Sequence, residues 1–138
     1  MAFSGNFACT VFKTGLMSGA FDFTTEQFYI ALYTNAATLT ANTTEYTSNG
    51  EVTAPGYSAR ALQVTTDPTT GPSGNIAYIS FADVTWEVAM TARGALIYKP
   101  GANGAVCVLD FGNDKTSVTD FTVQFPPATN TSAIIRLA

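Results

Sequence analysis

The groups that could do chemistry in this sequence are mainly carboxylates, because Asp and Glu together occupy ten of the 138 positions and histidine occupies none. A pair of carboxylates on either side of a substrate can act as general acid and as nucleophile or base, as in glycosidases. Here the acidic residues stand singly in turn-like segments, as Asp67, Asp83 and Asp114 do. Asp is favoured in turns because its side chain bonds to nearby backbone amides. We therefore predict turn formation for these residues, and not acid–base catalysis.

Nucleophilic catalysis that relies on histidine is excluded, since no imidazole is present to take a proton from serine or cysteine. The two cysteines, Cys9 and Cys107, lie far apart in the sequence and lack the CxxC spacing of zinc and redox sites. We predict that both are small buried apolar residues, with a disulfide as the alternative.

Asp114, together with Asp110 and Asp120, offers the option of a calcium site, but the spacing of the three is not that of an EF-hand loop. Asp110 is predicted to lie in a strand and to pair with Arg93 or Lys99 of the preceding strand. The sequence therefore predicts no metal, no cofactor and no enzymatic activity.

Composition favours a protein that associates with copies of itself. Charged residues make up 12% of the chain, hydrophobic residues make up 46%, and the mean hydropathy is +0.17. This charged share is about half of the usual one, so the surface must be rich in Thr, Ser, Asn and Ala. Little charge repulsion then keeps copies apart, and self-assembly is expected. A hydroxyl-rich monomeric β-protein is the alternative.

The charge pattern argues against two classes of partner. The net charge is −4, the pI is about 4.4, and the six Lys and Arg residues are scattered, whereas a nucleic-acid binder needs clustered cations. No apolar run approaches the roughly 18 residues of a membrane span, and the N-terminus lacks the order of a signal peptide. We expect a soluble protein made in the cytosol that binds neither nucleic acid nor membrane.

The elements that carry these side chains are mostly short strands, because alternating side chains are separated by Gly and Pro. The run over residues 28–33 is apolar on both faces, which predicts a central strand covered on both sides. A Pro/Gly turn is predicted over residues 67–74. The predicted strands cover residues 28–33, 60–65, 76–81, 84–88, 93–98, 105–111, 120–125 and 133–137.

The opening of the chain differs from the rest. Cys9, Phe12 and Leu16 recur on one face of a short helix predicted over residues 7–17 and ended by Gly19. Residues 36–58 are irregular, and such a long loop is expected to contain a helical turn near residues 43–47 or to make contacts of its own.

These elements predict a mainly β fold, either an antiparallel β-sandwich or a flattened barrel of about eight strands, with a short N-terminal helix. Residues 1–138 are predicted to form a single β-sandwich domain, in which residues 1–23 are an N-terminal arm and the short helix. Its predicted core includes Leu32, Trp86 and Leu109.

Several strings of residues resemble a family of small virion structural proteins of tailed bacteriophages. The likeness covers nearly the whole chain and is weakest between residues 36 and 75. It is carried by scaffold sequences and contains no catalytic signature. The strings are Met1-Ala2-Phe3, Asn6-Phe7, Cys9-Thr10, Phe12-Lys13 and residues 28–33, 91–98, 108–112, 114–117, 121–126 and 133–136.

The resemblance implies a non-catalytic component of the virion, assembled in the cytoplasm of the bacterial host. A decoration or cement protein that stabilises the capsid shell is the first expectation, and a neck or tail adaptor or fibre-attachment protein is the alternative. The implied partners are other copies of the chain, as a trimer or ring, and virion proteins such as the major capsid protein or neck and tail proteins. Copy number distinguishes shell from neck or tail.

Two further expectations concern aromatic residues. Phe3, Phe7, Phe21 and Phe23 cluster near the N-terminus and are candidates for a protein interface, with packing on the chain's own core as the alternative. The arm over residues 1–7 is expected to be well ordered only where a neighbouring subunit adds contacts.

A glycan-binding β-sandwich is a less favoured function. In it, Trp86, Tyr46 and Tyr57 would stack on sugar rings, although each also suits a core or turn position.

Overall fold

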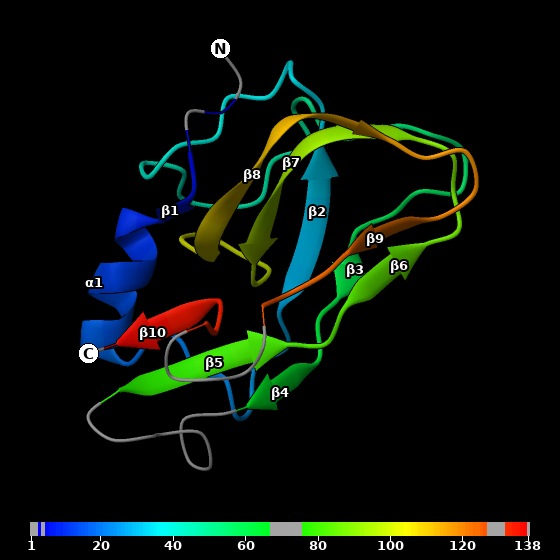
Figure 1. Ribbon diagram of the computed structural model, residues 1–138. Helices are drawn as coiled ribbons and strands as arrows, with labels where there is room; N and C mark the ends of the chain where they lie inside the picture. Colours follow the sequence, from blue (N-terminus) through cyan, green and yellow to red (C-terminus); the bar gives the residue numbers. More distant parts are fainter. Residues whose placement is uncertain (1–2, 4, 67–75, 127–131, 138) are drawn as a thin grey trace.

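The computed structural model describes residues 3, 5–66, 76–126 and 132–137, so the turn predicted over residues 67–74 lies outside the described residues. Within the described residues the chain forms ten strands and one helix (Figure 1). Their bounds are β1 Phe7–Ala8, α1 Thr10–Ser18, β2 Tyr29–Tyr33, β3 Arg60–Ala61, β4 Val64–Thr66, β5 Ala77–Phe81, β6 Val84–Trp86, β7 Thr91–Tyr98, β8 Ala105–Thr116, β9 Phe121–Val123 and β10 Ile135–Leu137.

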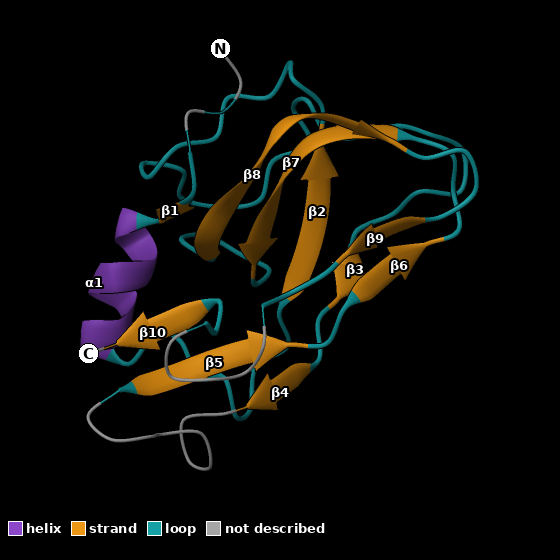
Figure 2. Cartoon of the chain, in the orientation of Figure 1, coloured by secondary structure: helices purple, strands orange, loops and turns teal. Residues whose placement is uncertain are grey.

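The strands form two layers, with α1 beside them at one end (Figure 2). The larger sheet has the strand order β1-β8-β7-β2-β3 and the smaller sheet has the order β10-β5-β4, with β6 and β9 as a further pair. Neighbouring strands are antiparallel throughout. Both strand orders are open, so the fold is sandwich-like and not a closed barrel. The predicted mainly β fold with one short helix is confirmed.

β2 is the central strand that its sequence predicts. It pairs with β7 on one side and β3 on the other, and residues 30–33 are all buried. The irregular segment 36–58 packs beside it, since the Tyr33 hydroxyl donates a hydrogen bond to the Thr47 carbonyl at 2.7 Å. Leu39 and Val52 of this segment are buried. The segment therefore makes contacts of its own, and no helical turn forms over residues 43–47.

A long bent ribbon connects the two ends of the sandwich. β6 leads into β7 and β8 leads into β9. The β6–β9 pair is therefore continuous with the β7–β8 pair around a bend. Residues 87–90 and 117–120 form this bend, and we call them the tip; Figure 1 shows it at the right-hand edge. Ser117 joins its two halves, because its backbone N–H donates to the Met90 carbonyl at 2.8 Å and its hydroxyl donates to the Val88 carbonyl at 2.8 Å.

The bend explains two differences from the predicted strands. The strand predicted over residues 84–88 ends at Trp86, where the chain enters the tip. The strand predicted over residues 105–111 continues to Thr116, because its far half pairs with the start of β7.

The strand predicted over residues 60–65 is divided into β3 and β4. β3 belongs to the larger sheet and β4 to the smaller one, so the chain passes from one layer to the other at Leu62. Leu62 is buried there and its N–H donates to the Phe28 carbonyl at 2.8 Å.

The helix starts later than predicted and ends where predicted. Phe7 and Ala8 pair with β8 as β1, so α1 begins only at Thr10. Gly19 ends it in the left-handed conformation, with φ of 78°, which glycine adopts without steric cost.

Aromatic packing holds α1 against the strands. The Phe12 ring meets the Phe21 ring edge-on at 5.0 Å between centroids and the Phe23 ring at 5.9 Å. Phe23 in turn stacks on Phe28, next to β2, at 4.5 Å. Edge-on and offset-stacked pairs of this kind contribute about 0.5–1.5 kcal/mol each beyond the area they bury.

Candidate functional site

The three carboxylates considered as an optional calcium site, Asp110, Asp114 and Asp120, form no cluster of metal ligands. In the part of the chain that the structure describes, no three His, Cys, Asp or Glu side chains are close enough to hold a metal ion. Asp110 accepts hydrogen bonds from the Gly112 N–H at 2.8 Å and from the Arg93 Nε at 3.2 Å, and these contacts lower its pKa below the ordinary value. The predicted cross-strand pair is therefore confirmed with Arg93. Lys99 pairs instead with Glu26, at 2.7 Å.

Both cysteines are free and buried, as predicted. Burial raises the pKa of Cys9 to about 11 and that of Cys107 to about 12. The thiolate is the reactive form of cysteine, so burial disfavours the reactive form of both side chains.

A cluster of tyrosines surrounds Glu51. The Glu51 carboxylate accepts hydrogen bonds from the Tyr46 hydroxyl and, at 2.8 Å, from the Tyr57 hydroxyl. Tyr57 also accepts a hydrogen bond from the Leu32 N–H at 2.8 Å, which satisfies a backbone group at the edge of β2. The cluster thus fastens the segment 36–58 to the central strand.

Burial and the contacts with Glu51 raise the pKa values of four tyrosines. The hydrogen bond to Glu51, followed by burial, raises the pKa of Tyr46 to about 12. Burial is the main cause that raises the pKa of Tyr33, Tyr57 and Tyr98.

We predict that the protein loses stability as the pH rises above about 10, the ordinary pKa of tyrosine. A raised folded-state pKa means that folding favours the protonated phenol. This contribution is fully present below the unfolded-state pKa and is lost as the pH rises through the folded-state value. Urea unfolding from about pH 8 to about pH 11 measures it. The Tyr46→Phe variant is the control and should lose less over the same range; equal losses in both proteins would contradict the prediction.

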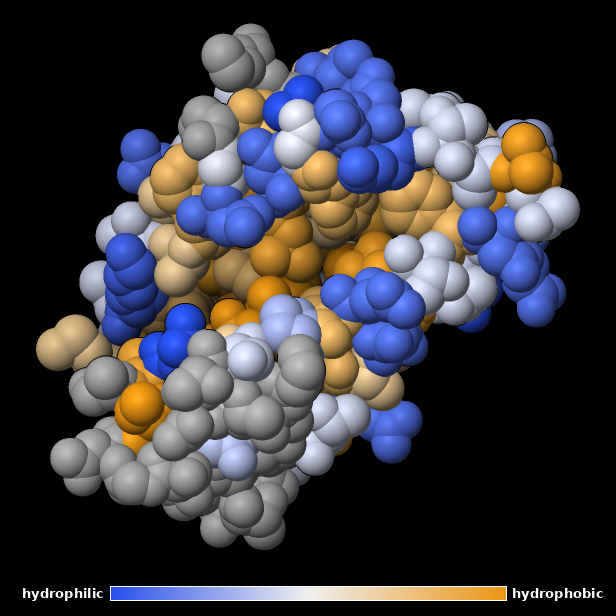
Figure 3. All heavy atoms as spheres, viewed as in Figure 1, coloured by the Kyte–Doolittle hydropathy of each residue, from blue (hydrophilic) through white to orange (hydrophobic). Residues whose placement is uncertain are grey.

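An apolar groove lies between α1, β8 and β10. Its volume is about 460 Å³, and Figure 3 shows it as an orange hollow between the upper and lower parts of the molecule. We call it the β10 groove. Its main apolar lining residues are Phe7, Leu16, Leu109, Ile134, Ile135 and Leu137.

The β10 groove exposes a strand edge as well as side chains. β10 is the outer strand of its sheet, paired with β5 on one side, and its residues line the groove. No described residue pairs with its other side. A free strand edge can accept another chain. Leu137 is 56% exposed there, so the side chains of the described residues leave this end of the groove open.

The charge of the β10 groove has one sign. Lys13 of α1 and Arg136 of β10 both line it, and none of its described lining residues carries a carboxylate. The ion pairs formed among the described residues are Arg93–Asp110 and Lys99–Glu26, so neither groove cation is neutralised by an ion pair within them. The groove is therefore apolar inside and basic at its edges.

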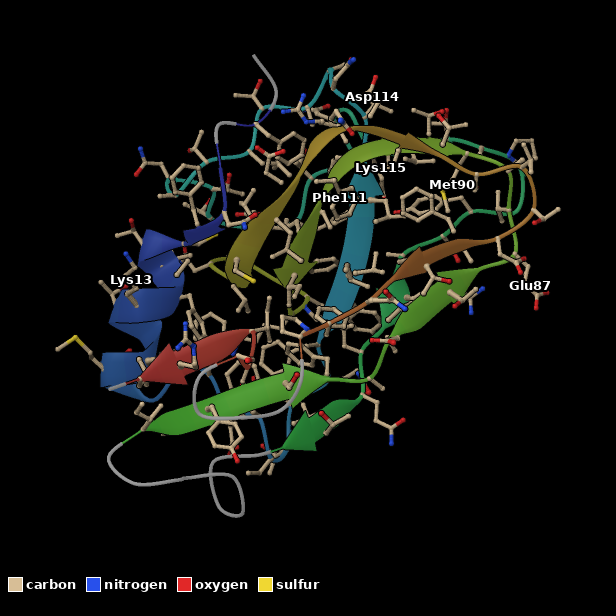
Figure 4. All side chains as sticks on the ribbon, viewed as in Figure 1. Lys13, Glu87, Met90, Phe111, Asp114 and Lys115 are labelled. Carbon is tan, nitrogen blue, oxygen red and sulfur yellow. The ribbon has the colours of Figure 1, made fainter. Side chains whose placement is uncertain are left out.

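The tip is a second exposed surface, at the other end of the molecule. Val118 is 84% exposed there, and the carboxylates Glu87 and Asp120 are also exposed. Figure 4 shows Glu87 and Lys13 at opposite ends of the molecule.

The predicted interface aromatics lie mostly inside the chain's own core. Phe3, Phe21 and Phe23 are 2%, 8% and 7% exposed. They therefore pack on the core of their own chain, which was the alternative to a protein interface. Phe7 is partly exposed and lines the β10 groove.

The described residues of the N-terminal arm have contacts within the chain. The Phe3 ring is buried, and the Asn6 side-chain oxygen accepts a hydrogen bond from the Asp110 N–H at 2.6 Å. That the arm over residues 1–7 is well ordered only beside a neighbouring subunit stays a prediction.

Trp86 is unavailable for stacking on a sugar. It is fully buried, and its indole N–H donates to the Ser58 carbonyl at 2.7 Å. The Tyr57 hydroxyl is engaged with Glu51 and Leu32 and its ring is partly buried, so Tyr46, 38% exposed, is the most exposed ring of the three.

Comparisons with known proteins identify no relative. No family model, curated protein or solved structure matches this chain. The resemblance to tailed-phage virion proteins therefore stays a prediction. In addition, no helix among the described residues is long and apolar enough to cross a membrane.

Proposed function

We propose that this protein is a non-catalytic structural component of a tailed-bacteriophage particle, and that within the particle it is a decoration protein of the capsid shell. The observation that carries the proposal is the open β10 groove, an apolar surface beside a free strand edge. Exposed apolar surface of this kind marks interaction sites when it is contiguous. The resemblance of several sequence strings to virion proteins is the reason why we propose a phage particle as the assembly in which this surface binds.

The chemistry of the remaining side chains supports a structural role. Asp110 is engaged by Arg93, Glu51 is engaged by two phenols, and both thiols are buried. A binding role instead requires surface. Stable attachment to neighbouring subunits needs a total of about 1,000 Å² or more buried in each interface. The groove and the tip give the chain two separate surfaces for such contacts.

Mass spectrometry of purified particles, with stoichiometry measured against the major capsid protein, tests the proposal. We expect hundreds of copies per particle, as the shell requires. About six to twelve copies would match the closed ring of a neck or tail and would replace the shell assignment. Absence of the chain from purified particles would contradict a role in the virion.

A further inference from the structure

The two exposed surfaces of the chain are complementary in chemistry. The β10 groove is apolar with Lys13 and Arg136 at its edges, and the tip presents Val118 beside two carboxylates. In the described part of the chain, the tip carboxylates, like the groove cations, take part in no ion pair. Each surface therefore offers what the other lacks, an apolar side chain for an apolar hollow and opposite charges around it.

The tip is built to insert as a unit. The hydroxyl and backbone of Ser117 tie its two halves together, and the Met90 N–H donates back to the Ser117 hydroxyl at 3.2 Å. Met90 is buried beneath it while Val118 is 84% exposed. A pre-ordered projection loses less conformational entropy on binding than a flexible loop does.

One chain cannot make this contact with itself, because the groove and the tip lie at opposite ends of the molecule (Figure 4). We infer that the tip of one copy docks in the β10 groove of a second copy, head to tail. The inference rests on the proposed structural function, whose neighbours it identifies as further copies of the chain. A head-to-tail contact joins two different surfaces, so repeated contacts form a ring when the rotation closes.

The charges disfavour the symmetrical alternative, in which two grooves face each other. Such a dimer would place Lys13 and Arg136 of one copy against the same cations of the other. Like charges brought together across an interface suppress that pairing.

Sedimentation of the purified full-length chain measures the contact. One variant reverses the groove with Lys13→Glu and Arg136→Glu, and a second reverses the tip with Glu87→Lys and Asp120→Lys. All four side chains are exposed, so both variants should fold, which circular dichroism checks. We expect each variant to self-associate at least about tenfold more weakly than the unaltered chain.

Mixing the two variants gives the decisive result. The acidic groove of the first variant then meets the basic tip of the second. The unaltered acidic tip of the first variant likewise meets the unaltered basic groove of the second, so association should return. Arg60→Glu and Glu45→Lys, made separately, are the controls, because they reverse exposed charges outside both surfaces. These controls should associate like the unaltered chain. Replacing Val118 with Ser should weaken association without changing any charge.

Three outcomes would overturn the inference: an unaltered chain that stays monomeric at about 1 mM, reversed variants that associate normally, or a mixture that does not recover. The proposed function is tested separately. A chain that is present on particles but monomeric in solution refutes the head-to-tail contact alone. A chain that shows the charge-swap rescue but is absent from particles refutes the virion role alone.

Discussion

Replacing Leu32 with alanine should lower the free energy of unfolding by about 2–5 kcal/mol. Leu32 is fully buried in the central strand β2, where it pairs with Ala95 of β7. Truncation removes buried methyl groups and leaves a cavity that strands bonded on both sides cannot readily fill. Urea unfolding followed by circular dichroism measures the loss.

Leu109→Ala is the matched control for this prediction. The sequence places Leu32 and Leu109 together in the core, but Leu109 is only partly buried and lines the β10 groove. Its truncation should therefore cost clearly less than that of Leu32. Equal losses for the two variants would mean that the groove is closed in solution and that Leu109 is buried as deeply as Leu32.

Gly94→Ala should also destabilise the fold, by about 1–3 kcal/mol, as insertion into a packed site does. A methyl group at this position of β7 would lie 2.5 Å from the Leu109 carbonyl oxygen and 2.5 Å from the Phe3 ring. Neither distance is tolerable, so the ring must move and the neighbouring strand must shift. The absence of a side chain at Gly94 is thus what lets the Phe3 ring lie in the core.

A double-mutant cycle tests this explanation. Phe3→Ala alone removes a buried ring, and such truncations cost about 3–5 kcal/mol. In the double variant the ring is no longer there to be displaced, so the loss should be smaller than the sum of the two single losses, with a coupling of about 0.5–3 kcal/mol. Strictly additive losses would show that the Phe3 ring does not contact Gly94.

The central strand could be predicted from the sequence because its signal is local. Residues 28–33 are apolar on both faces, and only a strand covered on both sides keeps such a run from water. The end of α1 at Gly19 and the pairing of Asp110 with Arg93 depend on similarly short-range patterns, since one is a helix-cap preference and the other a contact between neighbouring strands.

The ends of several other elements depend on partners far away in the sequence. Phe7 and Ala8 have a helical pattern, yet β8 offers them backbone hydrogen bonds and they form β1. Residues 60–65 have the pattern of one strand, yet the strand is interrupted at Leu62 because the chain passes there from the larger sheet to the smaller one. In both places tertiary pairing outweighs a weak local preference.

The aromatic residues near the N-terminus also combine a property that the sequence predicts with one that only the fold decides. Composition marks Phe3, Phe21 and Phe23 as rings that must be buried, but it does not say in which chain. The fold decides, because Gly94 leaves space for Phe3 and because Phe12 and Phe28 offer faces to the other two rings.

By itself, the sequence determined a mainly β chain of low charge, with no histidine for acid–base or nucleophilic catalysis and with its cysteines buried. The candidate site was decided only by the tertiary structure, because Leu16, Leu109 and Ile135 come from a helix and two strands that meet across the sandwich. The one sequence signal that could have pointed to the tip is Val118, a single large apolar residue in a polar turn. Such a residue is normally explained by burial, and only the folded chain shows it exposed, because the bend of the ribbon turns it away from every layer of the core.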